Sequence, residues 1–61
     1  MTQEEKKEIV RKALSSASKL LIELNDLLDN IDDLETFMYI LNFRNSILCK
    51  CNDLMKKYDI E

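Results

Sequence analysis

One stretch of five residues, Asp29-Asn30-Ile31-Asp32-Asp33, is the only place where a helix in this chain is expected to stop and restart, because the sequence contains no glycine and no proline. Asp and Asn side chains compete for the backbone, and Asn tolerates the left-handed conformation that closes a helix when Gly is absent. We therefore predict that Asn30 ends a first helix and that Ile31 folds back onto its last turn. Asp32 is the predicted N-cap of a second helix, because Glu35 follows it at the spacing of a capping box.

The first helix is expected to span about residues 3–29. Thr2 and Glu5 stand at the spacing of a capping box, so the helix begins almost at the first residue. From Val10 to Ile31 the apolar residues, apart from Ile22 at position f, fill positions a, d and e of a heptad. A stripe of this width needs more than one neighbouring helix to cover it.

The second helix, about residues 33–58, repeats this template in phase from Phe37 to Tyr58. A short corner at 29–33 makes the helices antiparallel. The predicted fold class is therefore all-α, an antiparallel two-helix hairpin that forms a single domain, residues 1–61. Part of each stripe stays uncovered, so we expect two chains to form an antiparallel four-helix bundle. Its predicted core is Val10, Leu14, Ala17, Leu21, Leu24, Leu28, Phe37, Leu41, Leu48, Cys51 and Met55.

Composition argues against an enzyme and against a bound cofactor. The chain has no histidine, and the serines at positions 15, 16 and 18 have no evident base. Cys49 and Cys51 are two positions apart on a helix and cannot bridge each other. We expect Cys51 to be an apolar filler and Cys49 to be exposed, with a Cys-x-Cys soft-metal site as the less favoured alternative. A calcium site at Asp29, Asp32 and Asp33 is disfavoured, because the spacing is not that of the twelve-residue loop with its central Gly.

The first eight residues are charged, and no apolar run approaches the length of a membrane span. These features predict a cytoplasmic protein without a membrane partner.

Two features of the expected helix interface have alternative interpretations. The side chains are small from Ala13 to Ser18; we favour a close approach of the helices there, and a groove that accepts a partner's side chain is the alternative. Arg44 interrupts the apolar stripe, and in a hairpin that closes near Asn30 it should lie level with Ala17 and Ser18. We favour a residue that fixes the register, with its stem packed and its guanidinium at the rim or on a carboxylate. A contact with an anion or a partner is the alternative.

Charge is distributed unevenly along the expected rod. All nine Lys and Arg residues lie in segments 1–19 and 44–61, whose six acids leave a net +3, whereas segment 20–43 carries six acids and no base, a net −6. The acids just before the corner lie at a helix C-terminus, where the helix dipole favours cations. This mismatch suggests a function for the acidic corner.

The leading functional hypothesis is a small non-enzymatic protein–protein interaction module, an inhibitor or adaptor that docks on a basic surface of a larger protein. Stand-alone helical proteins of this size look like accessory proteins of phages and plasmids. Met38, Tyr39 and Phe43 lie off the apolar stripe, so they either widen the core or form an interaction patch. The candidate docking residues are Glu23, Asp26, Asp29, Asp32, Asp33, Glu35, Met38, Tyr39 and Phe43.

RNA binding is the second hypothesis. Leu20-Leu21 and Leu24-Asn25-Asp26-Leu27, on a helix of an expected hairpin dimer, are similar to the pattern of the plasmid Rop proteins. That resemblance implies RNA recognition by the first helix. The corresponding face would be Lys12, Ser15, Ser16 and Lys19, supplemented by Lys6, Arg11 and Lys50.

Overall fold

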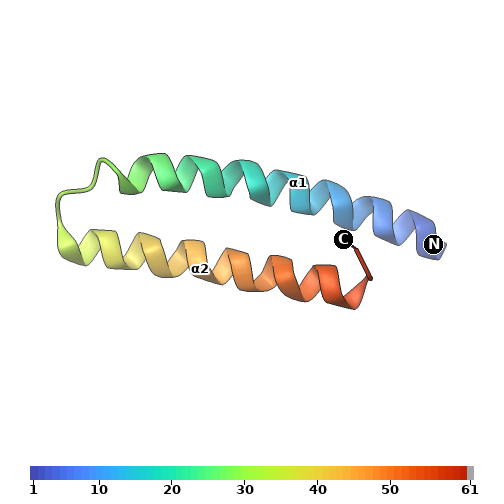
Figure 1. The fold of residues 1–61 in the computed structure, drawn as a ribbon. Coiled ribbons are helices and arrows are strands. Elements are labelled where there is room, and N and C mark those ends of the chain that lie inside the picture. The colour runs from blue at the N-terminus through green and yellow to red at the C-terminus, as the bar shows by residue number, and fades with distance from the viewer. Residues whose placement is uncertain (61) are drawn as a thin grey trace.

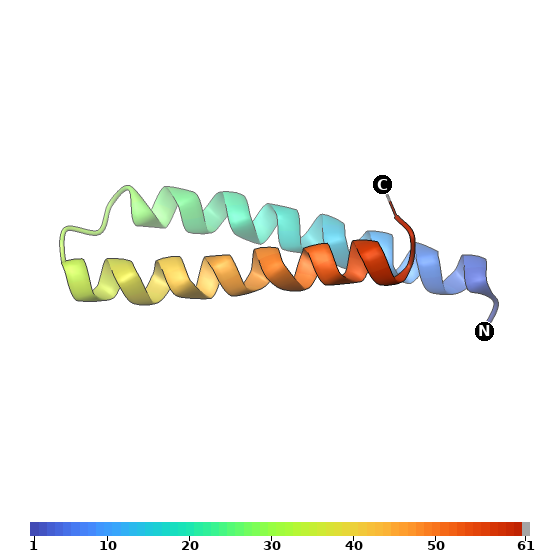
Figure 2. The same ribbon diagram turned by 60° about the horizontal axis from the view of Figure 1, so that its bottom comes forward.

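The computed structural model describes residues 1–60 as two antiparallel helices joined by a short corner (Figure 1). Helix α1 spans Gln3–Leu28 and helix α2 spans Leu34–Lys57. The helices lie side by side in both views. The start of α1 and the end of α2 both lie toward the end of the rod opposite the corner, where α1 extends beyond α2 (Figures 1 and 2). The hairpin measures 47 × 18 × 16 Å. The predicted all-helical hairpin is therefore confirmed.

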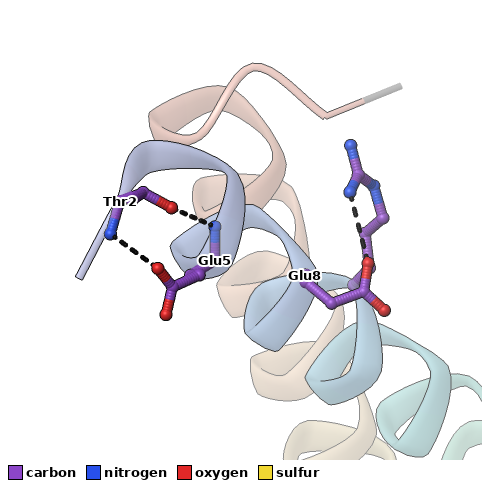
Figure 3. A network of polar contacts seen from close by, with 4 residues as sticks. Thr2, Glu5 and Glu8 are labelled. Atoms are coloured by element: carbon purple, nitrogen blue, oxygen red, sulfur yellow. Dashed lines mark hydrogen bonds and ion pairs between the residues drawn. The ribbon is translucent and has the colours of Figure 1, made fainter.

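Helix α1 begins at the predicted capping box (Figure 3). The Glu5 amide donates to Thr2 Oγ1 over 3.1 Å, and the Thr2 amide donates to Glu5 Oε1 over 3.3 Å. Glu8 and Arg11 form an exposed ion pair of 3.6 Å on the next turns. The two reciprocal bonds satisfy amides that have no partner within the helix, which explains why α1 starts at Gln3.

The end of α1 differs from the prediction. Asp29 is the C-cap and has right-handed helical angles, with φ −64° and ψ −20°. Asn30 does not have positive φ, so its predicted left-handed conformation is wrong. Asn30 acts through its side chain instead, because its Nδ2 donates to the Asp26 carbonyl over 3.0 Å. The Ile31 amide donates to the Leu28 carbonyl over 3.3 Å, so Ile31 does fold back onto the last turn.

Helix α2 begins one residue later than predicted. Its N-cap is Asp33, with extended angles of φ −98° and ψ 122°, and Asp33 Oδ2 accepts from the Thr36 amide over 2.7 Å. Asp32 is therefore not the N-cap, and Glu35 does not occupy the third helical position. Thr36 occupies the third helical position instead, and its amide donates to the Asp33 carboxylate. There is no reciprocal bond of a capping box, and this one carboxylate acceptor is sufficient to start the helix.

The C-terminus of α2 closes with a motif that the sequence analysis missed. Tyr58 is the C-cap, and Asp59 is the only described residue with positive φ, at 54°. The Ile60 amide donates to the Met55 carbonyl over 2.9 Å, and the Asp59 amide donates to the Lys56 carbonyl over 3.4 Å. These two bonds define a Schellman motif. It turns Ile60 back toward the helix pair.

The core of the single hairpin is small. Val10, Leu24 and Leu28 are its buried side chains among the residues that the structure describes, and Leu24 retains 5% exposure. Most other members of the predicted bundle core are half-buried, namely Leu14, Ala17, Leu21, Phe37, Leu41, Cys51 and Met55, while Leu48 is exposed. Positions a and e of α1 face α2, and position d, held by Ala13, Leu20 and Leu27, stays exposed. One edge of the stripe is therefore uncovered.

Candidate interaction surfaces

The small-residue segment of α1 lies beside hollows on both sides of the hairpin. Groove one has a volume of about 380 Å³ and is lined by Arg11, Leu14, Ser15, Ser18, Leu21, Leu48, Cys51, Asn52, Met55 and Ile60. Groove two has a volume of about 260 Å³ and is lined by Ala13, Leu14, Ala17, Phe43, Ser46, Ile47, Lys50, Cys51 and Leu54. The geometry therefore favours the groove interpretation of the small residues.

Groove one is partly closed by the end of the chain. The Schellman motif brings Ile60 to the wall of this groove, where Met55 also lies. An apolar contact between these two positions commonly accompanies the motif. Four of the lining residues are polar, Arg11, Ser15, Ser18 and Asn52. Groove one is therefore a mixed surface.

Groove two is more apolar and opens beside the uncovered edge of α1. Its polar lining residues are Ser46 and Lys50. Leu20 and Leu27 follow Ala13 at intervals of seven residues, so they continue the same edge of α1 toward the corner. Leu27 is 57% exposed and Phe43 is 52% exposed. We call this surface, made of Ala13, Ala17, Leu20, Leu27, Phe43 and Ile47, the Phe43 face.

The predicted patch of Met38, Tyr39 and Phe43 does not lie on one face. All three side chains are exposed, so none widens the core of the hairpin. Tyr39 and Phe43 are four residues apart and close together around the axis, whereas Met38 lies about 140° from Phe43 at about 100° per residue. Met38 shares its side of α2 with Leu34, which is four residues earlier and 76% exposed. The aromatic residues and Met38 therefore belong to separate surfaces.

Arg44 bonds to asparagines at the helix interface. Its Nε donates to Asn25 Oδ1 over 2.7 Å, and its Nη1 donates to Asn45 Oδ1 over 3.3 Å. The predicted contact level with Ala17 and Ser18 is wrong, because Asn25 lies about two turns closer to the corner. Side chains lean toward the N-terminus of their own helix, which for α2 is the corner, and the long Arg stem adds to this displacement. Arg44 is half-buried as a residue, and its guanidinium meets exposed neutral amides and no carboxylate within the described residues.

The acidic corner is a charged surface without internal partners. Its acids, Glu23, Asp26, Asp29, Asp32, Asp33 and Glu35, are all exposed. Within residues 1–60 the only ion pair is that of Arg11 and Glu8, at the opposite end of the rod. Hydrogen bonds from the Thr36 hydroxyl and the Thr36 amide lower the pKa of Asp33. The corner therefore remains anionic and open to a cationic partner.

The candidate RNA residues lie on the outer side of α1. Lys12, Ser15, Ser16 and Lys19 are all exposed. Lys12 and Lys19 are seven residues apart and share an edge of the helix, and Ser15 also lines groove one. The structure therefore leaves this face accessible.

The described residues contain no group of three or more side chains that could hold a metal ion. Cys49 is exposed and Cys51 is half-buried, and both are free thiols. Neither helix is long and apolar enough to cross a membrane.

No protein-family model, curated protein or solved structure matches this chain.

Proposed function

We propose that this chain is a non-enzymatic protein–protein interaction module. In this proposal two hairpins form a four-helix bundle, and the acidic corner docks on a basic surface of a larger protein as an inhibitor or adaptor. The observation that carries the proposal is the combination of an uncovered apolar edge with a corner whose acids have no cationic partner in residues 1–60.

The small core supports the dimer. Chains of this length rarely gain enough stability from one hydrophobic core, and oligomerisation is a common supplement. Only three described side chains are buried in the single hairpin, while Leu20, Leu27 and Phe43 remain exposed. Covering these side chains with a second hairpin would bury further apolar surface, at a gain of about 25 cal/mol for each Å².

The surroundings of the acids support docking by the corner. Leu34 is 76% exposed at the start of α2, and Tyr39 is 69% exposed little more than one turn further on. Large apolar and aromatic side chains beside a charged surface are typical of protein interfaces, where the charges guide association. A partner with a basic rim and an apolar centre would match this arrangement.

The decisive experiment captures partners from lysate of the source organism, with and without nuclease, using the tagged wild-type protein and two charge variants. The corner variant carries Asp29→Lys with Asp32→Lys. The control carries Glu4→Lys with Asp53→Lys, which changes the net charge equally at the far end. A stoichiometric protein that survives nuclease, is lost from the corner variant and is kept by the control would support docking. Equal capture by all three proteins would remove the hypothesis.

RNA binding is the second candidate because Lys12 and Lys19 are exposed on one edge of α1. The same capture tests it, since RNA recovered without a protein partner would favour that reading. Binding should then fall steeply with salt and disappear in a Lys12→Glu, Lys19→Glu variant.

A further inference from the structure

We infer that a second copy of this chain docks antiparallel on the Phe43 face, with its corner at the terminal end of the first copy, so that Phe43 of each copy covers groove two of the other. This inference rests on the proposed dimer and specifies its face and its direction. It follows from the distribution of apolar side chains around the hairpin and of charge along it.

The choice of face follows from the two grooves. Groove two is lined mainly by apolar residues and lies on the face that bears the exposed Leu20, Leu27 and Phe43. Groove one contains four polar residues and is partly closed by Ile60. A face of the hairpin, 47 Å long and 18 Å wide, offers on the order of 800 Å² to a partner, the area that each partner buries in a standard stable interface. The whole side of the hairpin that carries the Phe43 face is therefore large enough for self-association, and the Phe43 face supplies its apolar part.

The direction follows from charge. A two-fold axis that crosses the long axis of the rod places α1 over the partner's α1, with the two helices running in opposite directions. Lys12, Lys19 and Asp26 directly precede the three residues of the uncovered apolar edge of α1, so they lie about 100° around the helix from it and form the outer rim of the Phe43 face. The charge along this rim changes sign toward the corner. This antiparallel packing brings Asp26 of one copy beside Lys12 of the other. Corner-to-corner packing would instead bring two corners of net −6 together.

The same axis matches shapes on α2. Phe43 protrudes at the corner end of groove two, whereas Ala13 and Ala17 leave that groove hollow toward the termini. Reversing the direction of the partner places its Phe43 over this hollow, with Ile47 and Leu54 as apolar walls. An aromatic side chain that enters a small-residue hollow is a common form of interface anchor.

The direction is tested with the purified 61-residue chain, without any other partner, by sedimentation equilibrium at low salt. Asp26→Lys and Lys12→Glu should each weaken the dimer about tenfold, because each creates two like-charge contacts, and the double variant should restore wild-type affinity. The single-variant effects should shrink in high salt. Glu4→Lys makes the same charge change as Asp26→Lys at the terminal end and should not weaken the dimer.

The face is tested with two aromatic substitutions. Phe43→Ala should weaken the dimer at least tenfold, whereas Tyr39→Ala, four residues earlier and directed more to the outside, should leave it unchanged. An unaltered Phe43→Ala dimer would overturn the choice of face. A dimer tightened by Asp26→Lys would overturn the direction and leave the proposed dimer intact. A well-folded wild-type monomer at every concentration would overturn both the proposed dimer and this inference.

Discussion

Arg44 on α2 and Asn25 on α1 are joined across the hairpin by a 2.7 Å hydrogen bond between Nε and Oδ1. It is the only side-chain hydrogen bond between the two helices in the described part of the chain. Arg44 occupies heptad position a, which otherwise holds apolar residues. A polar residue at such a position selects one alignment of the helices, because a shifted alignment leaves it without a partner. We therefore expect the pair to favour this register of the hairpin.

The coupling of this pair can be measured by a double-mutant cycle. We expect Asn25→Ala and Arg44→Met each to lower the free energy of unfolding by about 1 kcal/mol, and the double variant to lose less than their sum. Met retains much of the apolar stem of Arg, so the cycle isolates the hydrogen bond. Urea unfolding at fixed protein concentration provides the measurement, and strictly additive losses would show that the two side chains act independently.

Leu24 should be the most sensitive position of the core. It retains 5% exposure, so Leu24→Ala removes buried apolar contacts and should cost about 2–4 kcal/mol. Ile22 lies on the same helix but is 63% exposed, and Ile22→Ala should change stability by less than about 0.5 kcal/mol. Thermal unfolding followed by circular dichroism compares the two, and equal losses would contradict the assignment of the core.

Asp33 should make the stability of α2 sensitive to acid. The hydrogen bonds from Thr36 lower the pKa of Asp33, so its contribution is complete above the ordinary Asp value of about 3.9 and is lost as pH falls through the lower folded value. We expect the stability difference between wild type and Asp33→Asn to shrink from pH 7 to pH 2.

The matched control for this titration is Asp32→Asn. It removes the same charge one residue earlier but leaves the N-cap carboxylate in place, so it should retain the acid-dependent loss. A difference between wild type and Asp33→Asn that stays constant with pH would contradict the role of the Asp33 carboxylate.

Asp59 should be replaceable by glycine with a gain in stability. Its φ of 54° lies in the left-handed region, which is unfavourable for residues with a Cβ atom. Asp59→Gly should raise the free energy of unfolding by up to about 1 kcal/mol. Asp59→Asn removes the negative charge but keeps a Cβ atom. It therefore distinguishes the conformational cost of positive φ from the unfavourable interaction of the charge with the helix dipole. An equal gain in both variants would attribute the effect to charge.

The features that the sequence predicted are those with a local signal. The Thr2 and Glu5 box depends on one spacing, and the antiparallel hairpin depends on a heptad that repeats in phase on both sides of one corner. The true N-cap was missed because Asp32 and Asp33 are adjacent and of the same type. Only the backbone angles at the corner show which carboxylate faces the first amides of α2.

The misplaced features depend on geometry between the helices. The residue of α1 that Arg44 contacts depends on the direction and length of the Arg44 side chain. Counting residues from the corner does not include either. Met38 and Phe43 were placed in one patch because neither belongs to the apolar stripe. They lie on opposite sides of that stripe, so they do not share a surface. The sequence did contain an indication of the Schellman motif, because Asp59 is followed by the apolar Ile60. Asp tolerates positive φ better than most residues with a Cβ atom, and an apolar residue after it can pack back on the helix.

The length of the hairpin has a consequence for any bound partner. In the proposed antiparallel pair the two acidic corners would lie at opposite ends of a rod about 47 Å long, so one dimer would offer two docking corners. Under the proposed docking, the two corners would bind either two separate copies of the partner or two repeated sites on one assembly whose spacing matches the rod. Binding at the second site then becomes intramolecular, and weak individual contacts can add up to strong avidity. A chain of 61 residues can in this way act as a molecular spacer.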